Sequence, residues 1–416
     1  MYTEIHQCRI CGNADLVSVL NLGRQYLTGV FPSSREQQLT CGPLELVACN
    51  VRDQQHHCGL LQLRQTYQVS EMYGHNYGYR SGLNRSMVTH LQAIVEHLRQ
   101  VVPTRVGDLV LDIGSNDGTL LSFYPAGEAI LCGIDPTAAK FRQYYGEDIR
   151  VIPDFFSAEL VRRRFGDQRA KIITSISMFY DLQRPMEFVR QIRDVLADDG
   201  VWLLEHSYLP AMLGANAYDT ICHEHLEYYA LRQLEWMMSK CGMKILDVSE
   251  NDTNGGSFAV TVARAESPHR PNNERIAAML AQERLGPHAS HRLEEFKQRT
   301  FAHRDKLVKL LTDLRREGKA VLGYGASTKG NVILQFCGIT PELLPAIAEV
   351  NRDKFGCFTP GTLIPIVSEE EARRMKPDAF LVLPWHFRDT LLEREAKYLQ
   401  HGGKMIFPLP NIEIVG

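Results

Sequence analysis

The chain has 416 residues, which exceeds one ordinary core and predicts two or three domains. With 44% apolar and 23% charged residues, it has the composition of a soluble globular protein. The net charge of −3 gives no reason to expect a broad surface for nucleic acid or anionic membrane. No run approaches the roughly 20 apolar residues of a membrane span. We therefore expect neither a nucleic-acid partner nor a membrane partner.

The ten cysteines give information about the cellular compartment, because disulfides form in oxidising compartments. Residues 1–7 are polar and carry no apolar signal core. Without such a signal, the cysteines are expected to be thiols and metal ligands, not a disulfide framework. We place the protein in the cytoplasm and expect a monomer.

Cysteines in the first 70 residues predict a structural zinc site. Cys8 and Cys11 are three apart and Gly12 follows them, so two thiolates can hold one ion while the backbone turns tightly around it. Cys58, which is also followed by glycine, is the predicted third ligand. Four cysteine ligands would leave no open position for a substrate.

The fourth zinc ligand is less clearly marked. We favour Cys49, because it ends the apolar stretch 44–48 while Cys58 precedes the apolar stretch 60–63. Two strands with residues 50–57 looped out between them would bring both thiols together. The competing candidates are Cys41, His56 and His57. Unrelated free thiols are the alternative interpretation.

The segment 73–82 is rich in tyrosine and glycine. Such a loop suits a lid or a ligand wall, and a tyrosine-rich packing turn is an equally good interpretation. The candidate ligand contacts here are Tyr77, Tyr79, Arg80 and Ser81. A helix is then predicted from about Asn84, and the apolar residues that recur along it belong to the core.

Residues 109–120 predict a strand, a glycine turn and the start of a helix. Gly114 and Gly118 let the backbone approach a ligand closely. The turn is not a dinucleotide G-x-G-x-x-G, because Asn116 stands at its second glycine position. Asp112 and Asp117 disfavour a pyrophosphate, since like charges would meet, and they suit a cationic ligand with ribose hydroxyls.

Further strands alternate with helical patterns and predict a doubly wound parallel sheet. They are expected at residues 130–134, 149–152, 171–176 and 200–206. Asp135 ends the second strand about 20 positions after the glycine turn, where it can accept both hydroxyls of a ribose. Together these features predict an S-adenosylmethionine (SAM) site, with an α/β domain lacking a cofactor as the alternative. The other predicted cofactor contacts are Ser115, Asp154, Phe155 and Met178.

Residues 219–229 gather histidines, carboxylates and tyrosines. These side chains span the pKa range that proton transfer uses. His223 and His225 are two apart, whereas two metal ligands on one helix face need a spacing of four. A buried polar cluster or a structural metal site is the alternative interpretation of this segment.

The segment 320–331 is a second strand, glycine turn and helix start. Its amides and Lys329 suit phosphate oxygens. It is not a Walker loop, because Lys329 follows Thr328 instead of preceding a serine or threonine. The alternative is a tight turn in a Rossmann-like domain that has lost its cofactor. Strands are expected later at residues 346–350, 380–383 and 404–407.

With these motifs in place, the chain resembles the zinc-containing, SAM-dependent sugar C-methyltransferases, typified by the C-3-methyltransferases of nucleotide-linked deoxysugars. The resemblance covers the whole chain, although the interval from Cys49 to Cys58 is longer than is usual. It is carried by Cys8 and Cys11 and by residues 77–81, 114–119, 223–225, 254–257 and 323–331.

The resemblance implies an α/β protein with three parts. These are a zinc-binding module (1–70), a Rossmann-like SAM methyltransferase domain (71–265) and a second Rossmann-like domain that holds a nucleotide sugar (266–416). The implied substrate is a 4-keto-6-deoxysugar linked to dTDP or GDP, which would bind between the last two domains. The implied substrate contacts, besides Tyr77, Arg80 and Ser81, are His206, Asn254, Ser257, Ser327, Lys329 and Asn331.

The resemblance also implies a mechanism. A base removes the proton on C-3, which the 4-keto group acidifies, and the enolate attacks the methyl of SAM. His225 takes the role of base, and Glu224 would orient it or contact a sugar hydroxyl. The candidate donors to the enolate oxygen are Tyr77, Tyr79, His223 and His206, without a ranking.

Two other function classes are possible from the motifs. An NAD-dependent epimerase or reductase would use the glycine turn at residues 323–325, but no Tyr-x-x-x-Lys pair follows it. A zinc-ribbon nucleic-acid-binding protein would need a basic patch with aromatic residues, and residues 1–70 are not strongly basic. Both fit the sequence less well than a methyltransferase.

Overall fold

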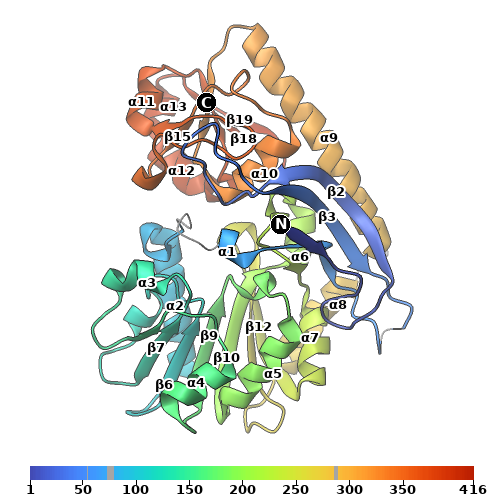
Figure 1. The fold of residues 1–416 in the computed structure, drawn as a ribbon, viewed down its shortest axis with the longest axis vertical. Coiled ribbons are helices and arrows are strands. Elements are labelled where there is room, and N and C mark those ends of the chain that lie inside the picture. The colour runs from blue at the N-terminus through green and yellow to red at the C-terminus, as the bar shows by residue number, and fades with distance from the viewer. Residues whose placement is uncertain (54, 73–78, 285–288) are drawn as a thin grey trace.

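The computed structural model describes residues 1–53, 55–72, 79–284 and 289–416. In Figure 1 the central sheet and its helices lie in the lower half of the view and the C-terminal α/β lobe lies in the upper half. The N-terminal sheet runs alongside both. The mixed α/β architecture, with a Rossmann-like central sheet and a second C-terminal α/β sheet, confirms the predicted fold class.

The N-terminal module is built from antiparallel strands. Its main sheet has the order β11-β4-β3-β2, and a separate pair joins β1 to β5. The strands flanking the 50–57 insert pair antiparallel, with Leu46 opposite Leu63, as the sequence predicted. The bounds are β1 (Tyr2–Glu4), β2 (Leu16–Tyr26), β3 (Cys41–Cys49), β4 (Leu61–Leu63), β5 (Gln65–Tyr67) and β11 (Glu227–Tyr228).

Strand β11 comes from the segment that contains the predicted catalytic residues. Glu227 pairs with Gln62 and Tyr228 pairs with Leu61, so this short strand extends the N-terminal sheet. At the other edge, β2 lies along the C-terminal lobe, where the Gln335 side chain accepts from the Tyr26 amide at 2.7 Å and donates to the Tyr26 carbonyl at 3.1 Å. The N-terminal module is therefore attached to both larger domains.

The central sheet has the order β12-β13-β10-β9-β6-β7-β8. Six of its strands run parallel, and β13, which lies between β10 and β12, runs antiparallel to them. The chain reverses its direction of winding between β6 and β9, which is where open α/β sheets bind ligands. The bounds are β6 (Leu109–Ile113), β7 (Ile130–Ile134), β8 (Arg150–Ile152), β9 (Ala170–Ile176), β10 (Leu196–Ser207), β12 (Met243–Asn251) and β13 (Ser257–Arg264).

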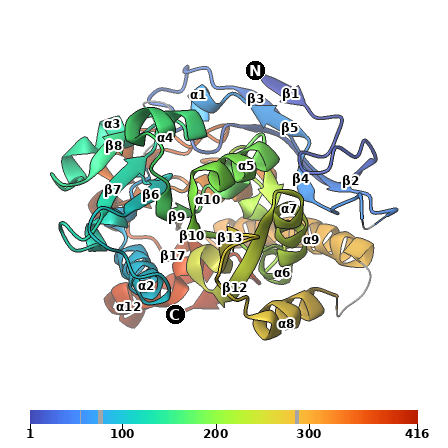
Figure 2. The same ribbon diagram turned by 90° about the horizontal axis from the view of Figure 1, so that it is seen from below.

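Helices cover both faces of this sheet (Figure 2), because its strands alternate apolar side chains between two buried clusters. Asn84 caps α2 by accepting from the Ser86 amide, and the buried stripe from Met87 to Leu98 follows at helical spacing. Helix α8 packs on β12. The bounds are α1 (Val69–Met72), α2 (Arg85–Val101), α3 (Ala138–Phe141), α4 (Ala158–Phe165), α5 (Pro185–Val195), α6 (Leu209–Gly214), α7 (Leu231–Lys240) and α8 (Asn273–Arg284).

The C-terminal lobe is a six-stranded sheet of order β16-β15-β14-β17-β18-β19, parallel except at its last strand. Its strands are β14 (Val321–Tyr324), β15 (Ile347–Glu349), β16 (Ile366–Ser368), β17 (Ala379–Val382), β18 (Lys404–Phe407) and β19 (Glu413–Val415). Its helices are α9 (Ala289–Arg316), α10 (Thr328–Phe336), α11 (Glu369–Arg374), α12 (Arg388–Arg394) and α13 (Ala396–Gln400).

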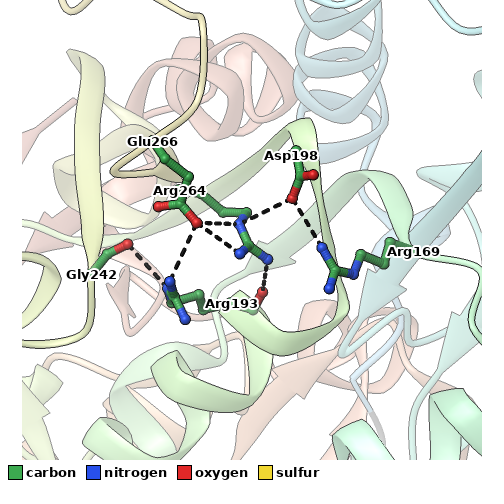
Figure 3. A network of polar contacts seen from close by, with 6 residues as sticks. All are labelled: Arg169, Arg193, Asp198, Gly242, Arg264 and Glu266. Carbon is green, nitrogen blue, oxygen red and sulfur yellow. Dashed lines mark hydrogen bonds and ion pairs between the residues drawn. The ribbon is translucent and has the colours of Figure 1, made fainter.

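An arginine network closes the central sheet at the edge away from the glycine turn (Figure 3). Arg264, at the end of β13, pairs with Glu266 at 2.7 Å and with Asp198 at 3.4 Å. Arg193 reaches the same glutamate at 3.3 Å, and Arg169 reaches Asp198 at 2.9 Å. The network ties together segments at the amino ends of the parallel strands, which leaves the carboxyl ends for ligands.

Among the described helices, none has the length and apolar character needed to cross a membrane.

Candidate active site

Four cysteines of the N-terminal module form one cluster. The sulfur atoms of Cys8, Cys11, Cys49 and Cys58 all lie within 4.8 Å of one another. The pairs Cys8–Cys58 and Cys11–Cys49 are each separated by 3.5 Å, close to the roughly 3.8 Å expected between thiolates around a tetrahedral zinc ion. Gly12 turns the backbone at φ 74°. The donor set and its spacing fit zinc.

The predicted fourth ligand, Cys49, belongs to this cluster, and its three competitors do not. Nδ1 of His56 is hydrogen-bonded to Oδ2 of Asp53 at 2.5 Å, and Nδ1 of His57 accepts from the Arg52 amide at 3.2 Å. Cys41 lies at the other end of β3. In the described part of the chain, this is the one group of three or more such ligands close enough to share an ion.

A cavity of about 280 Å³ opens at the carboxyl ends of the central strands. Its polar walls come from the glycine turn, from the end of β7 and from Asp154, and its apolar walls come from Met178 and neighbouring side chains. Predicted cofactor residues that line it are Asp112, Gly114, Ser115, Asn116, Asp135, Asp154, Phe155 and Met178. Gly118 is not among the lining residues; at φ 76° it shapes the turn against Tyr145.

The cavity has acidic walls that suit a cationic ligand. Asp135 accepts from the Asn116 amide at 2.9 Å and from the Thr137 amide and hydroxyl, each at 2.6 Å. Asp112 accepts from the Thr174 hydroxyl at 2.6 Å. Burial raises the pKa of Asp112 to about 7, against the lowering effect of that hydrogen bond. A bound cation would stabilise the charged form of both carboxylates.

His225 lies where the central domain meets the C-terminal lobe. Its Nδ1 is 2.9 Å from the Thr220 carbonyl oxygen, which requires a proton on Nδ1 and leaves Nε2 unprotonated in the neutral ring. The Tyr180 ring packs against it with centroids 4.3 Å apart. Burial, and next the charge of Lys329, lower the pKa of His225 to about 3. The imidazole is therefore a neutral group with one free acceptor nitrogen.

The other two members of the segment face the N-terminal module. His223 is fully buried, with Nδ1 3.3 Å from the Thr28 hydroxyl and its ring edge-on to Tyr67 at 4.6 Å. Glu224 is 3.5 Å from the same hydroxyl. Burial lowers the pKa of His223 to about 3 and raises the pKa of Glu224. His223 thus anchors the segment to the N-terminal module.

The C-terminal lobe contacts the central domain next to His225. Lys329 donates from Nζ to the carbonyl of Asn254 at 2.9 Å. The Trp385 indole donates to Oδ2 of the buried Asp219 at 2.7 Å, and Trp385 also borders the Gly255 backbone. Lys329 acts electrostatically on Asp219 as well as on His225. This junction places one lysine within electrostatic reach of Asp219 and His225.

Several predicted site residues have other surroundings. His206 is buried among aromatic rings, and burial lowers its pKa to about 4. Tyr79 and Ser81 line the 280 Å³ cavity, whereas Arg80 pairs with Asp117 at 3.4 Å and stacks on Tyr144. Tyr77 lies outside the described residues.

The remaining predicted substrate contacts already have protein partners. Ser327 caps α10 by accepting from the Gly330 amide at 3.0 Å. Asn331 donates to the Thr28 carbonyl at 2.7 Å, and Ser257 donates to the Thr253 carbonyl at 2.8 Å. Asn254, with φ 55°, donates from its side chain to the Ser177 hydroxyl at 3.5 Å. Of this group, only Asn254 contacts the junction around Lys329.

Sequence reasoning missed Asp219 and Trp385 as a pair, and it missed Thr28. Nothing in the spacing links residues 166 positions apart, so no local signal existed for the first pair. The positive φ of Asn116, Ser177 and Asn254, all near 50°, could not be read from sequence either. These strained residues surround the ligand-facing region, as is common at functional sites.

Comparison with known proteins adds the family. Three family models match: "Putative zinc binding domain" at residues 8–73, "Methyltransferase domain" at 87–248 and "C-methyltransferase C-terminal domain" at 252–410. The C-methyltransferase NovU of Streptomyces niveus is 30% identical over 417 residues, covering 99% of this chain and 97% of the relative. The chain belongs to the C-methyltransferase family. The predicted family is thereby confirmed.

Two solved structures match less than half of the chain. A Burkholderia thailandensis N1-methyltransferase is 14% identical, with a TM-score of 0.34, and the match covers 44% of this chain and 80% of that one. The YcgJ protein of Bacillus subtilis is 19% identical, with a TM-score of 0.32, and the match covers 42% and 97%. Both TM-scores lie below 0.5, so the functional conclusions depend on the family and on the site.

The family and the site agree on the cofactors. The acidic cavity at the winding reversal of the central sheet fits the cationic SAM, and the four-cysteine cluster fits zinc. The protein is therefore a SAM-dependent C-methyltransferase with a zinc-binding N-terminal module.

Proposed function

We propose that the protein methylates C-3 of a 4-keto-6-deoxysugar linked to a nucleoside diphosphate, dTDP or GDP. The observation that carries this is the position of His225. A neutral imidazole with Nε2 left as an acceptor packs on Tyr180, whose near neighbours in the chain, Met178 and Asp181, line the acidic cavity. Lys329 of the C-terminal lobe acts on the same imidazole electrostatically. A base near a methyl-donor site and within electrostatic reach of a cation would suit carbon methylation of an anionic substrate.

His225 performs the first chemical step. The 4-keto group acidifies the C-3 proton, and Nε2 takes that proton while the C–H electron pair moves into the enolate. The hydrogen bond to the Thr220 carbonyl fixes the ring and its tautomer, so Nε2 remains the acceptor. SAM, when bound, would supply the electrophilic methyl group: C-3 would form its new bond as the methyl–sulfur bond breaks, and neutral S-adenosylhomocysteine would leave.

Lys329 pairs with the negative charge of the substrate. Its ammonium has a partner in the Asn254 carbonyl, and it retains donors for phosphate or enolate oxygens. Its charge also lowers the pKa of His225. A diphosphate bound next to Lys329 would offset that charge and so strengthen the base when the substrate arrives.

The glycine turn after β14 contributes a site for the diphosphate. Ser327 caps α10, whose first amides point out of the helix. Together with Lys329 in the first turn, they favour an anion at this helix start. The nucleotide would then lie on the C-terminal lobe and the sugar near His225.

The test is a screen. The protein is incubated with SAM and a panel of 4-keto nucleotide sugars on dTDP and GDP, and products are analysed by mass spectrometry. We expect a mass gain of one methyl on at least one sugar, together with deuterium exchange at C-3 in heavy water. Methylation only of substrates without a keto group beside the reacting carbon would refute the proposal.

A further inference from the structure

Residues 27–32 form a short strap that continues from β2 of the zinc-binding module onto the C-terminal lobe. The Asn331 side chain donates to the Thr28 carbonyl at 2.7 Å. Four residues further on, the Phe358 amide donates to the Pro32 carbonyl at 2.8 Å. The strap is therefore fixed to the C-terminal lobe at two points, while its start is continuous with the zinc-binding module.

Glu224 of the central domain lies against this strap with both carboxylate oxygens. Its Oε2 accepts from the Thr28 hydroxyl at 3.5 Å. A Cβ on Gly29 would lie 2.3 Å from Oε1, whereas ordinary contacts begin at 3.4 Å, so Oε1 occupies the space that a side chain at residue 29 would need. The same Cβ would lie 3.5 Å from the Thr328 hydroxyl oxygen of the C-terminal lobe. The carboxylate is thus packed where all three parts of the chain meet.

The Thr28 hydroxyl belongs to a chain of hydrogen bonds that ends at Glu224. Its single proton is donated to the carboxylate, so Nδ1 of His223, 3.3 Å from the same oxygen, must be the donor on its other side. Burial raises the pKa of Glu224, and hydrogen bonds that include those from Cys222 and Thr28 oppose this effect. The buried imidazole therefore holds the hydroxyl, and the hydroxyl holds the carboxylate.

The surroundings of Glu224 indicate what its carboxylate can contact. Glu224 and His225 are both partly exposed, whereas His223 beside them is fully buried. Across the described ranges no hydrogen bond joins Glu224 to His225, whose Nδ1 is taken by the Thr220 carbonyl. A carboxylate can accept from a sugar hydroxyl but repels a phosphate, so its place beside the base favours the sugar end of the substrate.

We propose that Thr28 and Gly29 are positioning residues for Glu224, and that they hold its carboxylate where it accepts a hydrogen bond from a hydroxyl of the sugar. Thr28 supplies a hydrogen bond to one oxygen, and Gly29 supplies the space for the other. The proposal rests on the proposed function, in which the sugar lies near His225. The zinc-binding module thereby contributes two residues, neither of them a zinc ligand, to the arrangement of the substrate site.

The first test removes the Thr28 hydroxyl from the full-length, zinc-loaded protein. Thr28→Val keeps the side-chain shape and should lower kcat/KM for the keto sugar about tenfold, because the carboxylate loses a donor that holds it in place. The affinity for SAM should be unchanged. Thr28→Ser keeps the hydroxyl and should restore most of the lost kcat/KM. The matched control is Thr300→Val, which removes a buried hydroxyl of α9 that donates to the Phe296 carbonyl at 2.9 Å, and it should behave as the wild type.

A double-mutant cycle with Glu224→Ala separates positioning from a general effect on the fold. If Thr28 acts through the carboxylate, Thr28→Val should change kcat/KM by less than about twofold once that carboxylate is absent. An equal loss in both backgrounds, or full kcat/KM in the single variant Thr28→Val, would overturn the proposal.

The second test fills the space beside Oε1. The φ of Gly29 lies outside the left-handed region, so Gly29→Ala is compatible with the backbone and the new methyl acts on its neighbours alone. The carboxylate must move by about 1 Å, and kcat/KM should fall up to about a hundredfold. A crystal structure of the variant should show the carboxylate displaced from Thr28 while the hydrogen bond from Asn331 to the strap is retained.

The control for this variant is Gly214→Ala, because a Cβ on Gly214 would meet nothing within 4 Å. It should match the wild type. Normal kcat/KM in Gly29→Ala, with the carboxylate unmoved, would contradict the proposal. This variant also decides the matter if Thr28→Val does not fold.

A measurement on the free protein separates this proposal from the proposed function. The Thr28 hydroxyl donates to the ionised form of Glu224, so Thr28→Val should raise the carboxyl pKa by roughly one unit or less, whereas Thr28→Ser should leave it unchanged. The ¹³C chemical shift of the glutamate carboxyl, assigned from its loss in Glu224→Ala, measures that pKa.

The outcomes are distinguishable. If no keto sugar is methylated, but the pKa rises in Thr28→Val and Gly29→Ala displaces the carboxylate, the proposed substrate is wrong and the positioning of Glu224 stands. If keto sugars are methylated, but Thr28→Val and Gly29→Ala both retain the wild-type kcat/KM, the positioning is wrong and the proposed function stands.

Discussion

The central sheet and the C-terminal sheet each start with a strand and a glycine turn, but the side chains around the two turns differ in charge. Each has a glycine turn after its first strand and an acidic residue after its second. Asp135 accepts from the Asn116 amide at 2.9 Å, and Glu349 accepts from the Ala326 amide at 2.8 Å. The first turn is lined by further carboxylates, whereas the second has Lys329 in its helix and Lys354 4.0 Å from Glu349.

This difference indicates that a strand, a glycine turn and a helix start can favour ligands of either charge, depending on the side chains around the turn. Asp112 and Asp135 would favour a cation at the first turn, and, under the proposed function, the two lysines would favour an anion at the second. His225 lies at the junction of the two domains, where a cationic methyl donor and an anionic substrate would meet. Three variants or conditions test this division of roles.

The largest effect is expected at the junction itself. His225→Asn should lower kcat about a thousandfold, because it removes the proton acceptor, while the affinities for SAM and for the nucleotide sugar stay within a few fold. Isothermal titration calorimetry measures both affinities, and C-3 deuterium exchange measures base function directly. Full turnover by this variant would show that His225 is not the base and that the domain junction does not supply the proton acceptor.

The second effect concerns the basic turn alone. Lys329→Met removes a charged donor that the substrate would use, so substrate affinity should fall about tenfold to a hundredfold while SAM affinity is unchanged. Lys319→Met, which removes an exposed lysine paired with Asp378, is the control and should bind both ligands normally. Equal losses of the SAM and substrate affinities in Lys329→Met would contradict separate roles for the acidic and the basic turn.

The smallest effect concerns the acidic turn. The Asp112 carboxyl, with a pKa of about 7, is ionised above that pH and neutral below it, and a bound cation lowers its pKa. SAM affinity should therefore fall by up to about tenfold between pH 8 and pH 6. Asp112→Asn should flatten this dependence, whereas substrate affinity should lack it. A pH-independent SAM affinity in the wild type would show that Asp112 does not face the donor's charge.

The sequence by itself determined the elements and the metal site. Alternation of buried apolar strands with amphipathic helices, glycines at sharp turns and cysteines followed by glycine are local signals. They predicted β6 to β10, the strand pair around the 50–57 insert, and Cys49 in the cluster with Cys8, Cys11 and Cys58. Such signals come from backbone sterics and burial period, which act over a few residues.

Only the tertiary structure decided which polar side chains meet. The sequence grouped His223 with His225, yet their positions in the segment send the first toward Thr28 of the N-terminal module and the second toward the central domain and Lys329. It also gave no sign that Arg9 would lie against Glu227, or Trp385 against Asp219. Contacts between residues hundreds of positions apart depend on how whole sheets pack, and no local pattern in the chain encodes them.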